Sequence, residues 1–473
     1  MRESARERAR LTSNAMKKTI LLIICITIFA LAHLTAGEAF AARPHLSKDP
    51  KVQAARGLLK QRRYTEALEL LRPIVRESKG RADRTDVLFL AGLSAIEASR
   101  RLPPANVEEI TALLDEAIAA LRDILITQPG LVRVRLELAR AFFYKQEDNL
   151  SRQHFDRVLA GKPPKAMVSN INRFLRIMRA RRRWNAYFGF SIAPDTNIGA
   201  VSDSEVIYIF DLPFRRNNFE GASSGLGFVF WGGFEYQHPL EKRLRLRVGT
   251  DISRREYEGS RFDQMTVSLH AGPRWWMSPN TEMSLLASAR QRRSGGFVHS
   301  HEFGVRYELE HRLTRRIRLS GRASWHERNY ERDKHFDGPL LDLALVGSWV
   351  LTPTLQVRGG IGYAADNPEL LRSRNRSRWG RLGASIALPL GFTVGANAEL
   401  RTTNYKGSWP PFTPNDVLRE DEVRIYSASV FNRGFTAFGF SPQLIVVNEE
   451  RESNAQLHDY KRTRAELRFV RQF

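Results

Sequence analysis

The chain has 473 residues, a formal net charge of +23 at pH 7 and a pI near 10.5. This length leaves room for two or three domains and a sizeable core. The surplus of Lys and Arg argues for an anionic partner, which would be nucleic acid, an acidic lipid surface or an acidic protein. The N-terminus predicts export, which argues against nucleic acid as that partner.

The first predicted element is a secretory signal peptide over residues 1–42. Lys17 and Lys18 precede an apolar run from about residue 20 to residue 34, and "AFA" at 39–41 is typical of a signal-peptidase site. An uncleaved membrane anchor is the alternative, but the run is shorter than the roughly 20 residues that a spanning helix needs.

Two details of this segment bear on the mature protein. Translation can begin at Met1 or at Met16, since the residues between them are charged and unlike a signal peptide. Cys25, the only cysteine, lies inside the apolar run. The mature chain would therefore contain no thiol, disulfide or cysteine metal site, which is compatible with an oxidising compartment.

Residues 43–180 predict a helical domain. The segment is rich in Ala, Leu, Glu and Arg, with apolar residues at helical spacing. Three stretches, at 54–71, 114–130 and 136–164, place small and large residues as the 34-residue tetratricopeptide pattern does. We predict about three such repeats, with a plain helical bundle as the alternative. The helices would bind an extended peptide or another protein, or would only brace the next domain.

Residues 181–473 predict a transmembrane β-barrel. About fourteen runs alternate apolar and polar residues, and each is long enough for the roughly 9–11 residues of a membrane-spanning strand. In the clearest run Phe303 and Val305 have one parity, and Glu302 and Arg306 have the other. The thirteenth run is expected at 435–447. An even strand number returns both barrel ends to the periplasm.

The connections between these runs alternate in length. Tight ones such as "LTRR", "LTPT" and "LPLG" alternate with longer polar ones such as "RRSGGFVHS" and "NYERDKHFDGP". Outer-membrane barrels have short periplasmic turns and long outer loops, whereas a soluble sandwich, the alternative, has no reason to alternate in this way. We therefore expect a periplasmic tetratricopeptide-like helical domain followed by a 14-stranded antiparallel outer-membrane β-barrel, an α plus transmembrane β fold.

One face of the run 314–328 is apolar and the other is basic. The apolar residues are Ile317, Leu319, Ala323 and Trp325, and the basic ones are Arg316, Arg318 and Arg322. An arginine on the lipid face near the bilayer midplane costs about 2–4 kcal/mol, so we expect the arginines in the lumen.

Similar basic faces occur at Arg243, Arg245 and Arg247, and again at Arg462, Arg464 and Arg468. These arginines would contact an acidic client polypeptide or anionic solutes. The alternative is that they form internal ion pairs with carboxylates such as Glu302, Glu308 and Glu310.

The chain ends on a pattern typical of a barrel assembly signal. Phe473 shares its parity with Phe469 and Leu467, although Arg471 interrupts that face. We expect the barrel assembly machinery to recognise this strand after periplasmic chaperones deliver the chain. Outer-membrane lipids and lipopolysaccharide are further expected partners, the latter through the loop "RSRNRSRWGR", which is alternatively a plain solvated loop.

No catalytic, cofactor or metal site is expected. His299 and His301 lie two apart on one face of an extended segment and could share a metal ion, but a third ligand is not visible. A barrel hydrolase would need Ser, His and a carboxylate to converge, which sequence spacing does not reveal.

Several stretches of the chain are similar to one known family. "FSIAPDTNIGAV", "RREYEGSRFDQMTVSLHAG" and the closing "DYKRTRAELRFVRQF", together with the domain order, resemble the surface lipoprotein assembly modifier family. The resemblance implies an outer-membrane translocon, not an enzyme, that moves surface lipoproteins or secreted ligand-binding proteins from periplasm to cell surface. A polysaccharide-export porin, a passive porin and a structural adhesion barrel are the alternatives.

The first testable prediction concerns the C-terminal strand. Deletion of Phe473, or Phe473→Asp, should lower the amount of heat-modifiable folded barrel in outer-membrane fractions, because the apolar signal is lost. Export to the periplasm should be unchanged, as measured by signal-peptide cleavage. Normal folding of both variants would show that this residue is not part of the signal.

Overall fold

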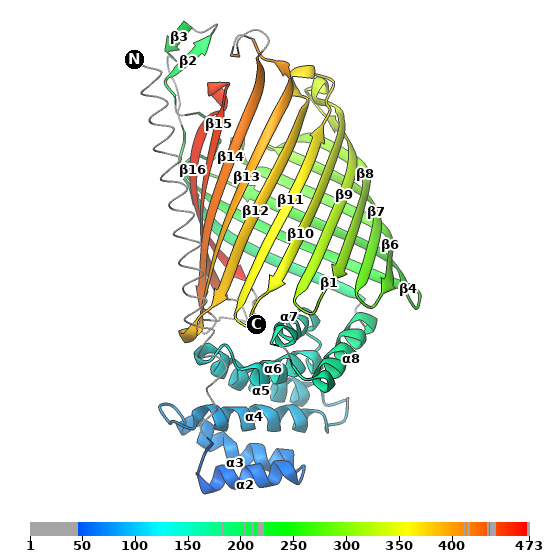
Figure 1. Ribbon diagram of the computed structural model, residues 1–473, viewed down its shortest axis with the longest axis vertical. Coiled ribbons are helices and arrows are strands. Elements are labelled where there is room, and N and C mark those ends of the chain that lie inside the picture. The colour runs from blue at the N-terminus through cyan, green and yellow to red at the C-terminus, as the bar shows by residue number, and fades with distance from the viewer. Residues whose placement is uncertain are drawn as a thin grey trace.

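A computed structural model describes residues 46–470, except for 162, 182, 203, 210–211, 216–221, 411, 414–416, 433–434 and 436–440. The predicted signal peptide and Phe473 lie outside the described residues. Within them, seven helices precede a closed antiparallel barrel of fourteen strands. Figure 1 shows the helices stacked beneath one mouth of the barrel, with α2 and α3 farthest from it. The expected fold class is confirmed.

The helices follow one another as a stack of neighbours. They are α2 (Pro50–Lys60), α3 (Tyr64–Glu77), α4 (Arg84–Ser99), α5 (Val107–Thr127), α6 (Val132–Tyr144), α7 (Asp148–Ala160) and α8 (Lys165–Arg181). The small residues Ala67, Ala117 and Ala139 are fully buried in this stack. At Gly92 an added Cβ would lie 2.9 Å from a side-chain carbon of Leu121, so α4 and α5 approach closely there. The tetratricopeptide assignment itself stays a prediction.

The barrel strands run antiparallel in chain order, and β1 closes the barrel by pairing with both β4 and β16. They are β1 (Trp184–Asp195), β4 (Gly225–Glu241), β5 (Leu244–Glu256), β6 (Gln264–Ser278), β7 (Thr281–Ser294), β8 (Phe297–Arg312), β9 (Ile317–Tyr330), β10 (Gly338–Val350), β11 (Leu355–Asp366), β12 (Asn375–Ala387), β13 (Phe392–Ser408), β14 (Leu418–Asn432), β15 (Ser441–Ser453) and β16 (Tyr460–Val470).

The barrel has two unlike ends. Short turns such as 242–243, 279–280 and 313–316 form the end against which the helices lie, here named the helical end. Longer connections form the opposite end, here named the loop end. The connection between β1 and β4 there contains a small hairpin of β2 (Val206–Ile209) and β3 (Leu212–Arg215) that the sequence did not predict.

Two strand boundaries at the loop end differ from the prediction. β15 ends at Ser453 instead of residue 447, and "RRSGGFVHS" is not a long loop, because β7 and β8 meet at a two-residue turn of Gly295 and Gly296. Both glycines have positive φ (57° and 83°), as a tight hairpin turn of this kind requires. The strands extend past the apolar pattern because, above the bilayer, both faces meet water and hydrophobic alternation no longer marks a strand.

Large apolar side chains cover the outside of the barrel. Trp325 is 48% exposed, and Leu345 and Trp349 on β10 are each 46% exposed. Val305 lies opposite Trp325 in the sheet, so both have the outward parity. This is the lipid-facing surface that the alternation predicted. No helix of the described residues is long and apolar enough to cross a membrane.

A pair of neighbouring substitutions on β10 tests this assignment of faces. Leu345→Arg, on the outward face near the middle of the strand, should destabilise the barrel by about 2–4 kcal/mol, because the guanidinium meets lipid. Val346→Arg, one residue on and facing the lumen, is the matched control and should cost much less. Urea unfolding in lipid vesicles measures both, and equal losses of stability would contradict the assignment.

Candidate functional site

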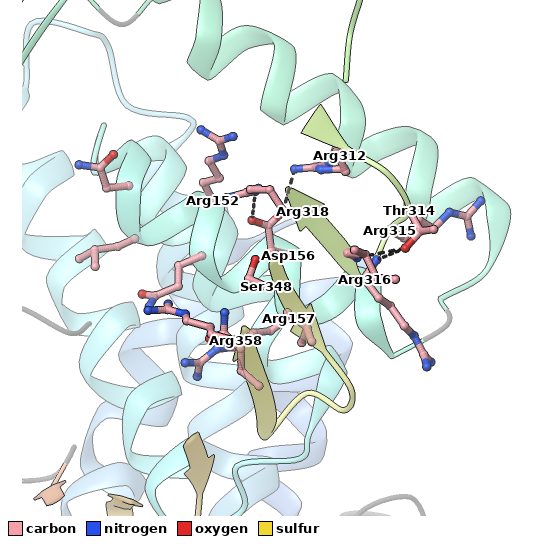
Figure 2. A pocket seen from close by; sticks show the side chains of 16 residues that line it. Arg152, Asp156, Arg157, Arg312, Thr314, Arg315, Arg316, Arg318, Ser348 and Arg358 are labelled. Atoms are coloured by element: carbon pink, nitrogen blue, oxygen red, sulfur yellow. Dashed lines mark hydrogen bonds and ion pairs between the residues drawn. The ribbon is translucent and has the colours of Figure 1, made fainter. Parts of the chain in front are cut away.

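Helix α7 is attached to the barrel through one carboxylate. Arg312 ends β8 and Arg318 lies near the start of β9, and the two are cross-strand partners. Like charges in that position repel each other. Asp156 of α7 relieves the repulsion, because Arg312 donates from Nη2 to Oδ1 (2.9 Å) and Arg318 donates from Nη2 to Oδ2 (2.6 Å). Figure 2 shows both contacts.

Helix α8 is attached through a second set of contacts. Arg245, only 8% exposed, donates from Nη2 to the carbonyl of Arg179 (2.7 Å), and its guanidinium lies 5.1 Å from the ring centroid of Trp276. Arg179 in turn donates to the carbonyl of Pro279 in a short turn (2.9 Å). Helices α7 and α8 are therefore attached to the barrel by polar contacts at its helical end.

A basic cavity of about 380 Å³ lies between α7 and the inner wall of β9, β10 and β11. Its arginines come from two helical turns of α7, from the 313–316 turn and from the strands beside it (Figure 2). They are Arg152, Arg157, Arg312, Arg315, Arg316, Arg318 and Arg358. Asp156 is the one acidic residue among the described residues that line this cavity. We call it the mouth cavity.

Four of these arginines have no counter-charge among the described residues. Within the part of the chain that the structure describes, no acidic side chain lies within ion-pair distance of Arg157, Arg315, Arg316 or Arg358. Burial lowers the pKa of Arg157, and the charge of Arg358 lowers it further. The mouth cavity thus concentrates positive charge that its own residues leave unbalanced.

Several lumenal arginines on the far wall have carboxylate partners. Arg247 pairs with Glu235 (2.5 Å) and Glu308 (2.6 Å), and Arg306 lies 3.0 Å from Glu308. Arg243 is different, since it is exposed in a short turn where its carbonyl accepts the amide of Trp276 (3.0 Å). On β4 to β8 the internal ion pairs that the sequence left open are therefore present.

The three arginines predicted on β9 have three different environments. Arg316 lies in the turn before the strand and lines the mouth cavity, Arg318 pairs with Asp156, and Arg322 lies farther along the lumen. Arg322 has no ion pair among the described residues, although Glu308 is its cross-strand neighbour. Their contact with a client stays a prediction.

Three residues of this region were missed by the sequence reasoning. Asp156 and Arg157 sit on a helix, and nothing in its pattern points to the barrel. Arg358 could have been predicted from the sequence, because it has the same inward parity on β11 as Gln356. It lies opposite Ser348 of β10. A parity count over every strand would have found it.

Strand β16, the last described strand, makes contacts on both of its faces. Leu467 lies outward and 37% exposed, and Phe469 stacks on Phe190 of β1 with ring centroids 4.7 Å apart. On the lumenal face Arg462 pairs with Asp195 (2.5 Å), and Arg464 and Arg468 both pair with Glu466 (2.8 Å and 2.5 Å). Their role in assembly stays a prediction.

The two candidate metal ligands have other partners. The ring of His299 packs edge-on against Tyr330, and Nε2 of His301 lies 3.1 Å from Glu331. The described residues contain no group of three His, Cys, Asp or Glu side chains that could hold a metal ion.

Comparison with known proteins places this barrel in a family. The family profile described as "Surface lipoprotein assembly modifier" matches residues 184–473. The chain belongs to the surface lipoprotein assembly modifier family. It is 23% identical over 369 residues to Surface lipoprotein assembly modifier 1 of Neisseria meningitidis, covering 76% of this chain and 72% of that protein.

Two further comparisons concern another member of this family and a solved structure. Surface lipoprotein assembly modifier 1 of Haemophilus influenzae is 20% identical over 434 residues, covering 86% of this chain and 82% of that protein. The outer membrane channel DcaP of Acinetobacter baumannii matches 60% of this chain and 96% of its own, at 8% identity and a TM-score of 0.38. With its family and its closed barrel, the chain is an outer-membrane protein.

Reversal of the charge at Asp156 tests the attachment of α7. Asp156→Lys places a third cation beside Arg312 and Arg318, so α7 should separate from the barrel and its amide hydrogens should exchange faster. Asp115→Lys is the matched control, because Asp115 is 52% exposed and pairs with Lys145 within the helical stack. Unchanged exchange in α7 of the Asp156 variant would contradict the attachment.

Proposed function

We propose that the chain is a translocon that delivers client proteins from the periplasm to the cell surface. The clients would be surface lipoproteins or related secreted ligand-binding proteins. Membership in the surface lipoprotein assembly modifier family supports this proposal. The observation that carries it is the position of α7, which Asp156 ties to the inner wall at one mouth of a closed barrel.

The proposal assigns a side of the membrane to each end of the barrel. Short turns are typical of the periplasmic side of outer-membrane barrels, so the helical end would face the periplasm. A client arriving there would meet the helical domain before it reached the lumen. Recruitment of the client would be the role of the helices, and passage would be the role of the barrel. No catalytic step is assigned to either part.

Polar contacts at the mouth are what a gated conduit requires. A few ion pairs and hydrogen bonds join α7 and α8 to the barrel, and each such polar contact contributes only modestly to stability. A passive or polysaccharide-export porin is the alternative, and it would need the mouth open at rest. Steady conductance of the purified protein in planar bilayers would favour the porin.

Surface display of a client tests the translocon directly. A lipoprotein encoded beside this gene should be labelled by antibody on intact cells several-fold more strongly when the protein is co-expressed. Its total amount and its lipidation should not change, and a lipoprotein of the inner membrane serves as the control. Equal display with and without the protein would contradict the proposal.

Protease added to intact cells should spare residues 46–181, because the helical domain would lie in the periplasm. Cleavage there would contradict the assigned sides of the membrane.

A further inference from the structure

The unbalanced charge of the mouth cavity calls for an anion from outside the cavity. Its guanidinium groups come from α7, from the 313–316 turn and from β9 and β11, so they converge from separate elements. Arg358 is also repelled by Arg318 and by Arg381 on β12. Guanidinium groups gathered in this way form charge-assisted, often paired hydrogen bonds with carboxylate or phosphate.

The position of the cavity excludes a membrane lipid as the natural occupant. Arg318, Ser348 and Arg358 line it, and on their strands they have the parity opposite to the lipid-facing Leu345 and Trp349. The cavity therefore opens toward the lumen and the helical domain, where polypeptide or a soluble anion has access and a bilayer headgroup does not.

The arrangement of charge favours an extended ligand over a small ion. Arg322 follows Arg318 on the inner face of β9, four residues and roughly 13 Å farther into the lumen. Arg381 lies on the inner face of β12, opposite Gly360 of β11, and its guanidinium lies over the ring of Trp379. It pairs with no carboxylate of the described chain. An extended segment with several carboxylates would contact this whole series, whereas an inorganic ion would contact one or two members.

Asp156 already shows how a carboxylate is held in the cavity. It lies across Arg312 and Arg318, and it is the group that ties α7 to the barrel. An incoming carboxylate would replace it on the same two arginines. Exchange of one carboxylate for another on the same arginines costs little free energy. Further contacts with Arg157 and Arg358 would favour binding of the incoming ligand over Asp156.

We propose that the mouth cavity binds an acidic polypeptide segment, whose carboxylates displace Asp156 and so release α7 from the barrel. This inference rests on the proposed function for the source of the segment, because a client would carry it. Binding would then open the mouth through which the same client passes. Asp156 acts as a built-in competitor that keeps α7 in place until an acidic segment arrives.

Peptide binding to the purified full-length protein in neutral detergent tests the site without any translocation. The probe is a fluorescent ten-residue peptide of alternating Glu and Ser, and its Lys and Ser counterpart is the control. Anisotropy should show binding of the Glu peptide alone, weakening with salt. Arg157→Gln with Arg358→Gln should weaken it roughly tenfold. Arg372→Gln with Arg378→Gln, at the loop end, should not.

The Asp156→Asn variant distinguishes two roles for Asp156, competition with the acidic ligand and a purely structural role in positioning α7. Removal of the competing charge should tighten binding of the Glu peptide, whereas a structural role predicts no change or a loss. In the wild-type protein the peptide should speed hydrogen exchange in α7. In the Asp156→Asn protein, exchange in α7 should be fast before peptide is added.

Other outcomes would overturn the inference. Equal binding of the Lys peptide, or no effect of the Arg157 and Arg358 substitutions, would show that the cavity is not the site. Inorganic phosphate that competes at the same concentration as the peptide would show a site for small anions. Peptide binding without client display in cells would leave the site in place and contradict the proposed function instead.

Discussion

Closure of the barrel is the constraint on which the rest of the structure depends. Inside a bilayer no water is available to the backbone, so every strand needs a partner on both edges. Here β1 meets that need by pairing with β4 on one side and with β16 on the other. Closure then separates an outer face, which contacts lipid, from a lumen, which is the only place within the membrane where the arginines of the strands can be solvated.

Once the arginines are confined to the lumen, their environment depends on which carboxylates reach them. Arg247 of β5 is balanced by Glu235 of the neighbouring strand β4 and by Glu308 of β8. At the helical end of β9 and β11 the strands supply no such partner among the described residues, and one carboxylate arrives from α7. The unbalanced positive charge of the mouth cavity therefore lies where the helices are attached.

The residues that attach α7 to the barrel are thus among those that line the positively charged mouth cavity. Arg312 and Arg318 repel each other across the 313–316 turn, and Asp156 relieves that repulsion while it positions α7. A contact of this kind is strong enough to place a helix and open enough to water to be exchanged for another carboxylate.

The order of a helical domain and a fourteen-stranded barrel could be predicted from the sequence alone. Alternation with period two revealed fourteen strands and the outward face of Trp325, because lipid on one side and water on the other act on every residue of a spanning strand. It did not determine where strands end beyond the bilayer, as β15 and the Gly295–Gly296 turn show, because water meets both faces there. Nor did it reveal which arginines are paired. Asp156 and Arg318 are 162 residues apart, and only the tertiary structure, by laying α7 against the mouth of the barrel, brings their charges within hydrogen-bond distance.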